Sequence, residues 1–429
     1  MVDRVDVAEV HLWDRQIGAV SWDKVRTLAT FEYEPGFLPS GIELAPLTIP
    51  LGPGLFRVPE LDFVAYRGLP GLLADSLPDK FGHLLIDTWL ASEGRDRSSF
   101  SPVEQLCYVG TRGMGALEYR PAYRGRDRSA QIQVERLADL AARVLERRED
   151  LQVDIEDGLA DLLLVGTSAG GARAKAIVAW NPHTGEVRSG QVEAPAGFQY
   201  WILKFDGVGS SDRELGDPEG YGRVEYAYHL MARRATIKMT DSRLQIDDRG
   251  RAHFMTKRFD RSNTGGKLHT LTLSAIAHLD YNQAGVHSYE DALSVTLRLC
   301  GAGDVSELYR RMVFNVVARN QDDHTKNISF VMDKAGVWRL APAYDLTWAY
   351  NPQGLWTSRH QMSIAGKTED LTHEDLLSVA DHFGIRRPEA IIEQVVEAVR
   401  QWPDIAADVG VDESYSRRIS STHRVALES

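Results

Sequence analysis

The stretch that most constrains this chain runs from residue 313 to residue 345. A largely apolar segment, Val313–Ala318, leads into a polar loop that contains Asp322 and Asn327. These two residues stand in the D-x-x-x-x-N relation of a kinase catalytic loop, where the aspartate takes the proton of the acceptor hydroxyl and the asparagine holds Mg²⁺. The spacing therefore predicts Asp322 as a catalytic base.

A second acidic residue, Asp345, follows Asn327 by eighteen residues, beyond a segment with the pattern of a hairpin. A kinase places its metal-binding aspartate after the catalytic loop in this way. Oxygen ligands from two neighbouring loops suit Mg²⁺, which takes few protein ligands and completes its shell with phosphates and water. We therefore expect ATP and Mg²⁺, with Asn327 and Asp345 as the metal ligands.

Composition sets broad limits on the protein. The chain has 429 residues, enough for two or three domains, and its net charge of −12 gives no general case for binding nucleic acid or membranes. The two cysteines match no metal or redox spacing. The N-terminus has no signal-peptide pattern and no window approaches eighteen apolar residues, so we expect a soluble, cytoplasmic protein with no membrane partner.

Residues 1–122 are predicted to form a β-rich subdomain, because short alternating patterns are separated by turn residues. The expected elements of this subdomain are strands in 5–13, 16–22 and 28–33, a helical stretch in 70–90 that breaks at Pro78, a short helix over 103–109, and a strand ending at Tyr119.

Residues 123–260 have the element order of a kinase N-lobe. The expected elements are a helical segment over 131–165, a Gly-rich loop over 166–175 that feeds a strand, a strand over 200–205, a helix over 223–234 and a strand over 252–259. Residues 261–429 are predominantly helical in pattern. The predicted fold class is α+β: a bilobal, protein-kinase-like fold with an N-terminal β-rich subdomain and a mostly helical C-terminal lobe.

Lys204 stands in an otherwise apolar strand and requires an explanation, because an unpaired buried ammonium group is costly. It could be a strand-end lysine that reaches solvent. Alternatively, it neutralises nucleotide phosphates and pairs with Glu225 on the following helix. The downstream motif favours the second interpretation.

The Gly-rich loop contains Gly170 and Gly171, and adjacent glycines let backbone N–H groups approach phosphate oxygens. Alone the pattern is typical of an ordinary turn, and it has neither P-loop nor Rossmann spacing. With Lys175 entering the next strand, a phosphate-covering loop is favoured. Thr167 and Ser168 are hydroxyls open to phosphorylation, which would add negative charge and repel ATP.

Three further residues of the polar loop remain open. Asp323 with His324 could belong to a di-acid/His metal site of a hydrolase, or Asp323 could be a solvated loop charge. Lys326 could stabilise the transferring phosphoryl group or only balance local acids. We assign no catalytic role to Asp323.

Together these motifs resemble the HipA family, serine/threonine-kinase toxins of bacterial type II toxin–antitoxin modules, over nearly the whole chain. The matching stretches are Leu12–Gly18, Leu73–Gly82, Ser168–Lys175, Ile202–Phe205, Lys257–Arg261 and the loop around Asp322.

The resemblance implies a role for each matched residue. Lys204 would bind the phosphates, the backbone of Lys257, Arg258 and Phe259 would contact adenine, and Asp322 would be the base. His324, Lys326 and Tyr344 would line the nucleotide site, with Asn327 and Asp345 on Mg²⁺. Ser168 would be the regulatory autophosphorylation site, and the loop that covers ATP would consist of Gly170, Gly171, Ala172, Arg173, Ala174 and Lys175.

The resemblance also implies partners: a protein substrate, a HipB-like helix-turn-helix antitoxin, and operator DNA mainly through that antitoxin. The best-known member of the family phosphorylates glutamate–tRNA ligase. This chain has Arg173 and Ala174 where that member has Gln-Glu, and Asp323 where that member has glycine. The substrate of that member is therefore not assigned to this chain. Two alternatives stay open: a small-molecule kinase, and a catalytically weak scaffold that co-represses an operon with the antitoxin.

Overall fold

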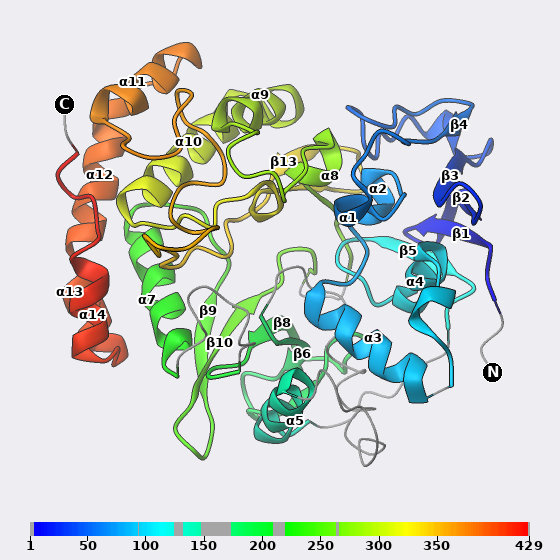
Figure 1. Cartoon of the computed structure of the whole chain (residues 1–429), viewed down its shortest axis with the longest axis horizontal. Coiled ribbons are helices and arrows are strands. Elements are labelled where there is room, and N and C mark those ends of the chain that lie inside the picture. Colours follow the sequence, from blue (N-terminus) through cyan, green and yellow to red (C-terminus); the bar gives the residue numbers. More distant parts are fainter. Residues whose placement is uncertain are drawn as a thin grey trace.

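The computed structural model describes residues 4–92, 94–123, 132–146, 173–208, 219–262 and 266–427 (Figure 1). The strands are β1 (Val7–Leu12), β2 (Arg15–Asp23), β3 (Leu28–Tyr33), β4 (Leu55–Phe56), β5 (Leu117–Arg120), β6 (Lys175–Trp180), β7 (Val187–Ser189), β8 (Gln199–Lys204), β9 (Ser242–Ile246), β10 (Ala252–Lys257), β11 (His269–Thr272), β12 (Ser329–Met332) and β13 (Trp338–Leu340). The α-helices are α1 (Phe63–Tyr66), α2 (Gly71–Ala74), α3 (Lys80–Ser92), α4 (Pro102–Val109), α5 (Val134–Glu146), α7 (Tyr221–Arg234), α8 (Leu273–Ala277), α9 (Tyr289–Cys300), α10 (Ala302–Val317), α11 (His373–His382), α12 (Pro388–Arg400), α13 (Trp402–Val409) and α14 (Glu413–Ser420). Three 3₁₀ turns are η1 (Leu38–Ser40), η2 (Arg97–Ser99) and η3 (Thr325–Asn327).

The N-terminal part is an antiparallel sheet in the order β4-β3-β2-β1-β5. Its strands alternate between buried and exposed side chains, as in β3, where Ala29, Phe31 and Tyr33 point into the core. This alternation is the period-2 pattern of a strand with one covered face. The strands expected from the sequence are confirmed, and so is the break at Pro78, which separates α2 from α3.

The second sheet has the order β7-β6-β8-β10-β9, and α7 packs against β10 and β9. The helix lies close because Gly222 has no side chain: a Cβ there would lie 1.9 Å from the carbonyl oxygen of Ala252. A hairpin joins β6 to β7. The predicted order of strand, strand, helix and strand is therefore confirmed.

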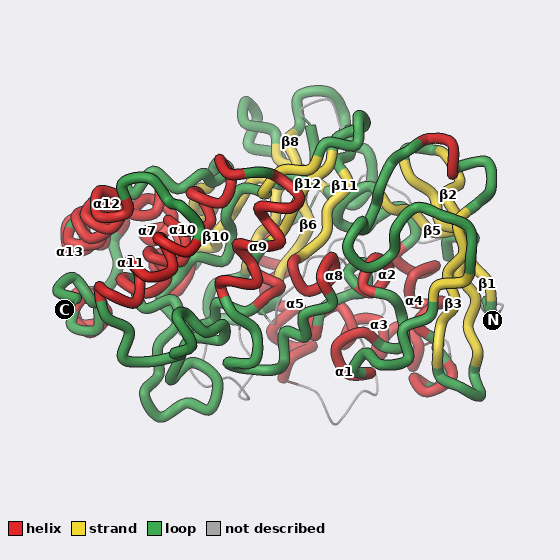
Figure 2. The backbone as a smooth tube through the Cα atoms, turned by 90° about the horizontal axis from the view of Figure 1, so that it is seen from above, coloured by secondary structure: helices red, strands yellow, loops and turns green. Residues whose placement is uncertain are grey.

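The C-terminal part is mainly helical, with a small sheet in the order β11-β12-β13. Helix α9 begins at Ser288, whose side chain and that of Asp291 form a capping box. Figure 2 shows α7, α10, α12 and α13 at one end of the molecule and β1 to β3 at the other. Of the helices within the described ranges, none combines the length and apolar composition that crossing a bilayer requires.

Helix α3 joins the N-terminal part of the chain to the part that carries the second sheet. Its residues Phe81 and Leu85 belong to the same apolar core as Leu137 of α5, Val178 of β6 and Met255 of β10. The N-terminal region therefore contributes side chains directly to the core beneath the second sheet.

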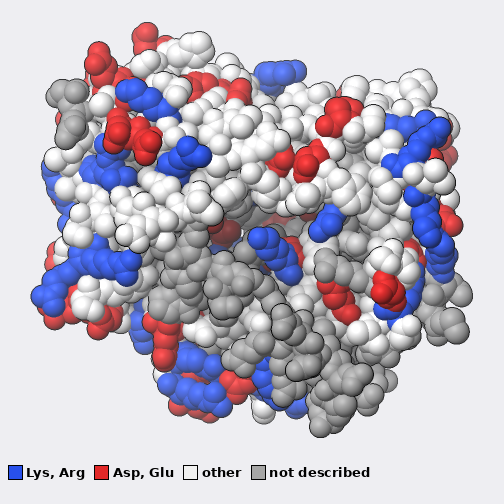
Figure 3. Space-filling model, viewed as in Figure 1, with Lys and Arg blue, Asp and Glu red and all other residues white. Residues whose placement is uncertain are grey.

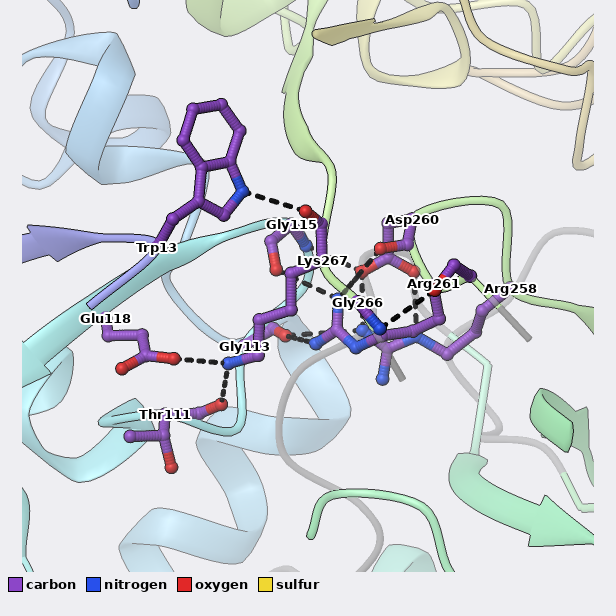
Figure 4. A network of polar contacts seen from close by, with 11 residues as sticks. Trp13, Thr111, Gly113, Gly115, Glu118, Arg258, Asp260, Arg261, Gly266 and Lys267 are labelled. Atoms are coloured by element: carbon purple, nitrogen blue, oxygen red, sulfur yellow. Dashed lines mark hydrogen bonds and ion pairs between the residues drawn. The ribbon is translucent and has the colours of Figure 1, made fainter. Parts of the chain in front are cut away.

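A buried polar network makes a second connection, between the loop 111–118 and the segment after β10 (Figure 4). The carboxylate of Asp260 accepts hydrogen bonds from the backbone N–H of Gly115 at 2.7 Å and from the guanidinium of Arg258. Arg261 donates to the carbonyls of Gly113 and Gly115. Burial alone would raise the pKa of Asp260, but Arg258 and Arg261 together hold it well below its usual range.

Candidate active site

Lys204, at the end of β8, is buried between two carboxylates. Its Nζ lies 2.5 Å from Oε1 of Glu225 on α7 and also contacts the carboxylate of Asp345, while its side chain is only 9% exposed. The interpretation of a lysine reaching solvent is therefore wrong. Burial disfavours its charged form, but Asp345 and Glu225 more than offset this, and the pKa of Lys204 is raised.

Glu225 also holds Arg173, which was predicted to belong to the ATP-covering loop. Nη1 of Arg173 donates to Oε2 of Glu225 at 2.9 Å, and its guanidinium lies 4.4 Å from the ring centroid of Tyr221. Ala174 is buried, and its carbonyl accepts from the N–H of Phe205. The other residues predicted for this loop lie outside the described residues: Ser168, Gly170, Gly171 and Ala172.

Lys175, the first residue of β6, lies directly opposite Lys204 in the antiparallel register. Its Nζ lies 3.2 Å from Oδ2 of Asp79, which comes from the N-terminal region just before α3. Arg173, Lys175 and Lys204 thus bring three cationic groups to the same end of the second sheet. Such a set suits an anionic ligand with several phosphates.

The predicted catalytic loop lies between α10 and β12. The side chain of Asp322 is 44% exposed, so it is accessible to a substrate, and its Oδ1 accepts the indole N–H of Trp356 at 2.6 Å. Nδ2 of Asn327 donates to the backbone carbonyl of Asp322 at 2.7 Å. Nε2 of His324 lies 3.9 Å from Oδ1 of Asp322. The structure therefore brings Asp322, His324 and Asn327 together.

Asp345 follows the β12–β13 hairpin, as the spacing predicted, and has a left-handed backbone with φ of 53°. Its carbonyl accepts the side-chain amide of Asn320 at 3.4 Å, which connects it to the start of the catalytic loop. Burial would raise the pKa of Asp345, but the ammonium groups of Lys204 and Lys175 outweigh burial and hold it below its ordinary value. His324 acts in the same direction.

The side-chain oxygen atoms of Asn327 and Asp345 are suitable ligands for Mg²⁺. Because Nδ2 of Asn327 is used by the carbonyl of Asp322, the amide oxygen is the atom left to face a cation. Asp345 is held as a carboxylate, the form that binds metal. Within the described residues, no group of three or more His, Cys, Asp or Glu side chains is arranged to hold a metal ion.

Asp323 differs from its predicted setting. Oδ2 of Asp323 accepts from the hydroxyl of Tyr289 at 2.9 Å and lies 2.7 Å from Nδ1 of His360, and Oδ1 accepts the N–H of Gln361. The interpretation of a solvated loop charge is wrong, because Asp323 is buried. The local sequence around Asp323 could not predict its burial, because two of its three partners, His360 and Gln361, lie after the β12–β13 hairpin.

In the segment predicted to contact adenine, several backbone groups already form hydrogen bonds within the protein. The N–H of Lys257 donates to the carbonyl of Asp241 and its carbonyl accepts from Thr240, while the N–H of Arg258 donates to the carbonyl of Tyr200. The side chain of Arg258 is buried in the network of Figure 4. The N–H groups of Lys257 and Arg258 are therefore already used within the protein, whereas a carbonyl that accepts one hydrogen bond can accept a second.

Phe259, the last residue of this segment, packs against Tyr344, with ring centroids 5.8 Å apart. The hydroxyl of Tyr344 donates to the carbonyl of Lys326 at 2.6 Å, which joins the catalytic loop to the residue before Asp345. Nζ of Lys326 lies 4.2 Å from the ring centroid of Tyr281. Burial raises the pKa of Asp75, and Lys326 opposes that shift, so Lys326 serves in part to balance a local acid.

Three residues of this site were missed by sequence reasoning: Asp79, Asn320 and Trp356. Asn320 lies two residues before Asp322, and its polar side chain next to an apolar helix was the available signal. Asp79 and Trp356 had no local signal, because their partners are distant in the sequence.

Two models of known protein domains match this chain. The sequence model of the HipA-like C-terminal domain matches residues 167–402, and that of the HipA N-terminal domain matches residues 8–120. No curated protein matches.

One solved structure shares the fold over nearly the whole chain. HipA of the Shewanella oneidensis MR-1 toxin–antitoxin system, solved with HipB and operator DNA, is 18% identical, with a TM-score of 0.67 over 96% of this chain and 95% of that one. The Helicobacter pylori proinflammatory kinase CtkA is 13% identical, with a TM-score of 0.38 over 59% of this chain and 90% of that one. The predicted bilobal, kinase-like fold is confirmed, and because the two domain models together match most of the sequence, this chain belongs to the HipA family.

Proposed function

We propose that this protein is an ATP- and Mg²⁺-dependent protein serine/threonine kinase that acts as the toxin of a toxin–antitoxin pair. The observation that carries the proposal is the pairing of Lys204 with both Glu225 and Asp345, next to a loop that exposes Asp322. In kinases a strand lysine paired with a helix glutamate holds the nucleotide phosphates, and a loop aspartate serves as the base.

In the proposed reaction, Asp322 orients the hydroxyl of a substrate serine or threonine and accepts its proton. The hydroxyl oxygen forms a bond to the γ-phosphorus of ATP as the bond to the β,γ-bridging oxygen breaks, and ADP leaves. Lys204, with Lys175 and Arg173 nearby, offsets the negative charge of the phosphates. Asn327 and Asp345 would hold Mg²⁺, which supplies further charge neutralisation when bound.

Nucleotide binding would also change the pairing of Lys204. In the present structure Asp345 is a partner of Lys204. We propose that Asp345 would be a ligand of Mg²⁺ and that Glu225 would keep Lys204 in position for the phosphates. For adenine, we propose the backbone from the carbonyl of Arg258 to Phe259, with the ring of Phe259 supported by Tyr344.

We further propose a HipB-like helix-turn-helix antitoxin as partner, with operator DNA reached mainly through it. The relative from Shewanella oneidensis was solved with HipB and its operator. A net charge of −12 gives this chain little electrostatic attraction to DNA by itself. On the face seen in Figure 3, basic and acidic side chains are interspersed.

The proposed substrate is a cytosolic protein, and an aminoacyl-tRNA ligase is one candidate.

Autophosphorylation at Ser168 is the proposed off-switch. A phosphate at this position would add about two negative charges to the loop that covers the nucleotide phosphates and would repel them. Mass spectrometry of the 166–175 peptide before and after incubation with ATP tests this step.

The Asp322→Asn variant tests the function. We expect phosphotransfer from labelled ATP, both to Ser168 and to a protein band in bacterial lysate, to fall by about 10²–10⁴-fold. The growth inhibition caused by expression should disappear. Asp333→Asn is the matched control, since this exposed aspartate lies in the β12–β13 turn, where its Oδ1 accepts two backbone N–H groups that an asparagine also satisfies. Full phosphorylation by Asp322→Asn would refute the assignment of the base.

A further inference from the structure

Two buried lysines face each other in the second sheet. Lys175 and Lys204 are direct cross-strand neighbours in the β6–β8 ladder, and both side chains are buried. Like charges directly opposite each other destabilise a sheet, and a buried cation is costly unless it is paired. Each lysine therefore needs a carboxylate. Lys204 has Glu225 and Asp345, and Lys175 has Asp79.

Asp79 comes from a different part of the chain than the other carboxylates of the site. It directly precedes α3 in the N-terminal region, and its Oδ1 accepts the N–H of Gly82 at 2.6 Å in the first turn of that helix. Its Oδ2 lies 3.2 Å from Nζ of Lys175, and the two side chains are only 5% and 4% exposed. One carboxylate thus fixes the start of α3 and the ammonium group of Lys175 together.

We infer that Asp79 is a positioning residue of the nucleotide site, through which the N-terminal region sets the affinity of Lys175 for phosphate. The inference rests on the proposed function, because it assumes that Lys175 meets the phosphates of a nucleotide. Asp79 acts through Lys175.

The physical reason lies in the flexibility of lysine and in the crowding of charge. A lysine side chain has several rotatable bonds and therefore loses rotamer entropy when it is fixed in one position. Without Asp79, repulsion from Lys204 would push Lys175 away from the face on which both lysines can meet one ligand. Asp79 holds the ammonium group in place before the nucleotide arrives, and such preorganisation increases affinity.

The direction of the pKa shifts agrees with this geometry. Burial lowers the pKa of Lys175, and Lys204 lowers it further, whereas Asp79 and Asp345 raise it. Asp79 thus favours the cationic form of Lys175, which is the form that binds phosphate. Burial raises the pKa of Asp79, with Lys175 opposing that shift.

A double-mutant cycle tests the inference with Asp79→Asn, Lys175→Met and the double variant in the full-length protein. Asparagine keeps the acceptor for the N–H of Gly82 and removes only the charge. The readouts are the Kd of a non-hydrolysable ATP analogue with Mg²⁺, measured by calorimetry, and the KM for ATP and kcat of autophosphorylation. Asp62→Asn is the matched control, since Asp62 also accepts N–H groups at a helix start, that of α1, and is exposed.

We expect Asp79→Asn to raise the Kd and KM about tenfold and to change kcat by less than about twofold, since coupled neighbours interact by about 0.5–3 kcal/mol. In the Lys175→Met background the same change should have little further effect. Asp62→Asn should bind like the wild type. Urea unfolding of each variant shows whether the folded fraction is unchanged under the binding conditions.

Three outcomes would overturn the inference, and they are distinguishable. If Asp79→Asn binds the analogue like the wild type, Asp79 does not position Lys175. If Asp79→Asn weakens binding equally with and without Lys175, its effect is structural. If the wild-type protein itself binds no nucleotide, the proposed function fails, and this inference fails with it.

Discussion

Nδ1 of His360 lies 2.7 Å from Oδ2 of Asp323, and both side chains are only 1% exposed. The hydroxyl of Tyr289 donates to the same carboxylate oxygen and in turn accepts the amide of Asn315. The oxygen of Asn315 accepts the amide of Asn320, whose side chain also donates to the carbonyl of Asp345. A buried polar chain therefore connects the residue next to the proposed base with the proposed metal ligand.

Asp323→Gly is expected to destabilise the protein and to lower its activity. The hydroxyl of Tyr289 and the N–H of Gln361 would lose a buried acceptor, which costs about 1–3 kcal/mol for each such group. The free energy of unfolding in urea and the rate of autophosphorylation measure the two effects.

Asp408→Asn serves as the control for this change, because Asp408 is an exposed aspartate on α13. Its stability should stay within about 0.5 kcal/mol of the wild type. Unchanged stability of Asp323→Gly would mean that the buried polar chain contributes nothing to folding, and would contradict this prediction.

Trp356→Phe is expected to lower kcat by about tenfold and to leave the KM for ATP unchanged. The indole N–H of Trp356 donates to Oδ1 of Asp322 at 2.6 Å and so holds the carboxylate that must face the substrate hydroxyl. Steady-state kinetics with varied ATP separates the two constants. Trp338→Phe is the control, since its indole donates to the carbonyl of Glu43 instead. A rise in KM without a change in kcat would contradict the role of Trp356.

Asp260→Asn is expected to destabilise the protein by about 3–5 kcal/mol at neutral pH, because it leaves the buried guanidinium groups of Arg258 and Arg261 without their carboxylate. The folded-state pKa of Asp260 is depressed, so its contribution is present above the unfolded value near pH 4 and is lost as the pH falls through the lower folded value. The difference between wild type and variant should therefore shrink below about pH 4.

Asp139→Asn provides a matched comparison for Asp260. Asp139 also pairs with two arginines, Arg249 and Arg251, but its side chain is 32% exposed. Its removal should cost less than about 1 kcal/mol. Equal losses in the two variants, measured by urea unfolding from pH 3 to pH 7, would show that burial does not govern these pairs.

Gly222→Ala is expected to displace α7 and the Glu225 that it carries. The added Cβ would lie 1.9 Å from the carbonyl oxygen of Ala252, and overpacking of this kind costs about 1–3 kcal/mol. Nucleotide affinity should fall together with the melting temperature. Gly303→Ala in α10 meets no atom within 4 Å and should be neutral or stabilising, since alanine favours a helix. Normal nucleotide affinity of Gly222→Ala would show that α7 tolerates the shift.

Local pattern determined much of this protein. The alternation of 28–33 predicted β3, the apolar run 200–205 predicted β8, and the helical stretch 223–234 lies within α7. The spacing from Asp322 to Asn327 and Asp345 placed three polar residues on two neighbouring loops, and the structure has them there. These features depend on residues close in sequence, where period and turn chemistry act directly.

Only the tertiary structure decided which charges meet. The loop around Asp322 contains two adjacent aspartates, and packing alone exposed Asp322 to solvent while enclosing Asp323 against Tyr289 and His360. The register of β6 on β8 set Lys175 opposite Lys204, and the docking of α3 brought Asp79 to it. The burial and pairing of these charges depend on contacts between segments far apart along the chain, so no local pattern encodes them. The free energy of a charged group depends on whether it is buried and paired.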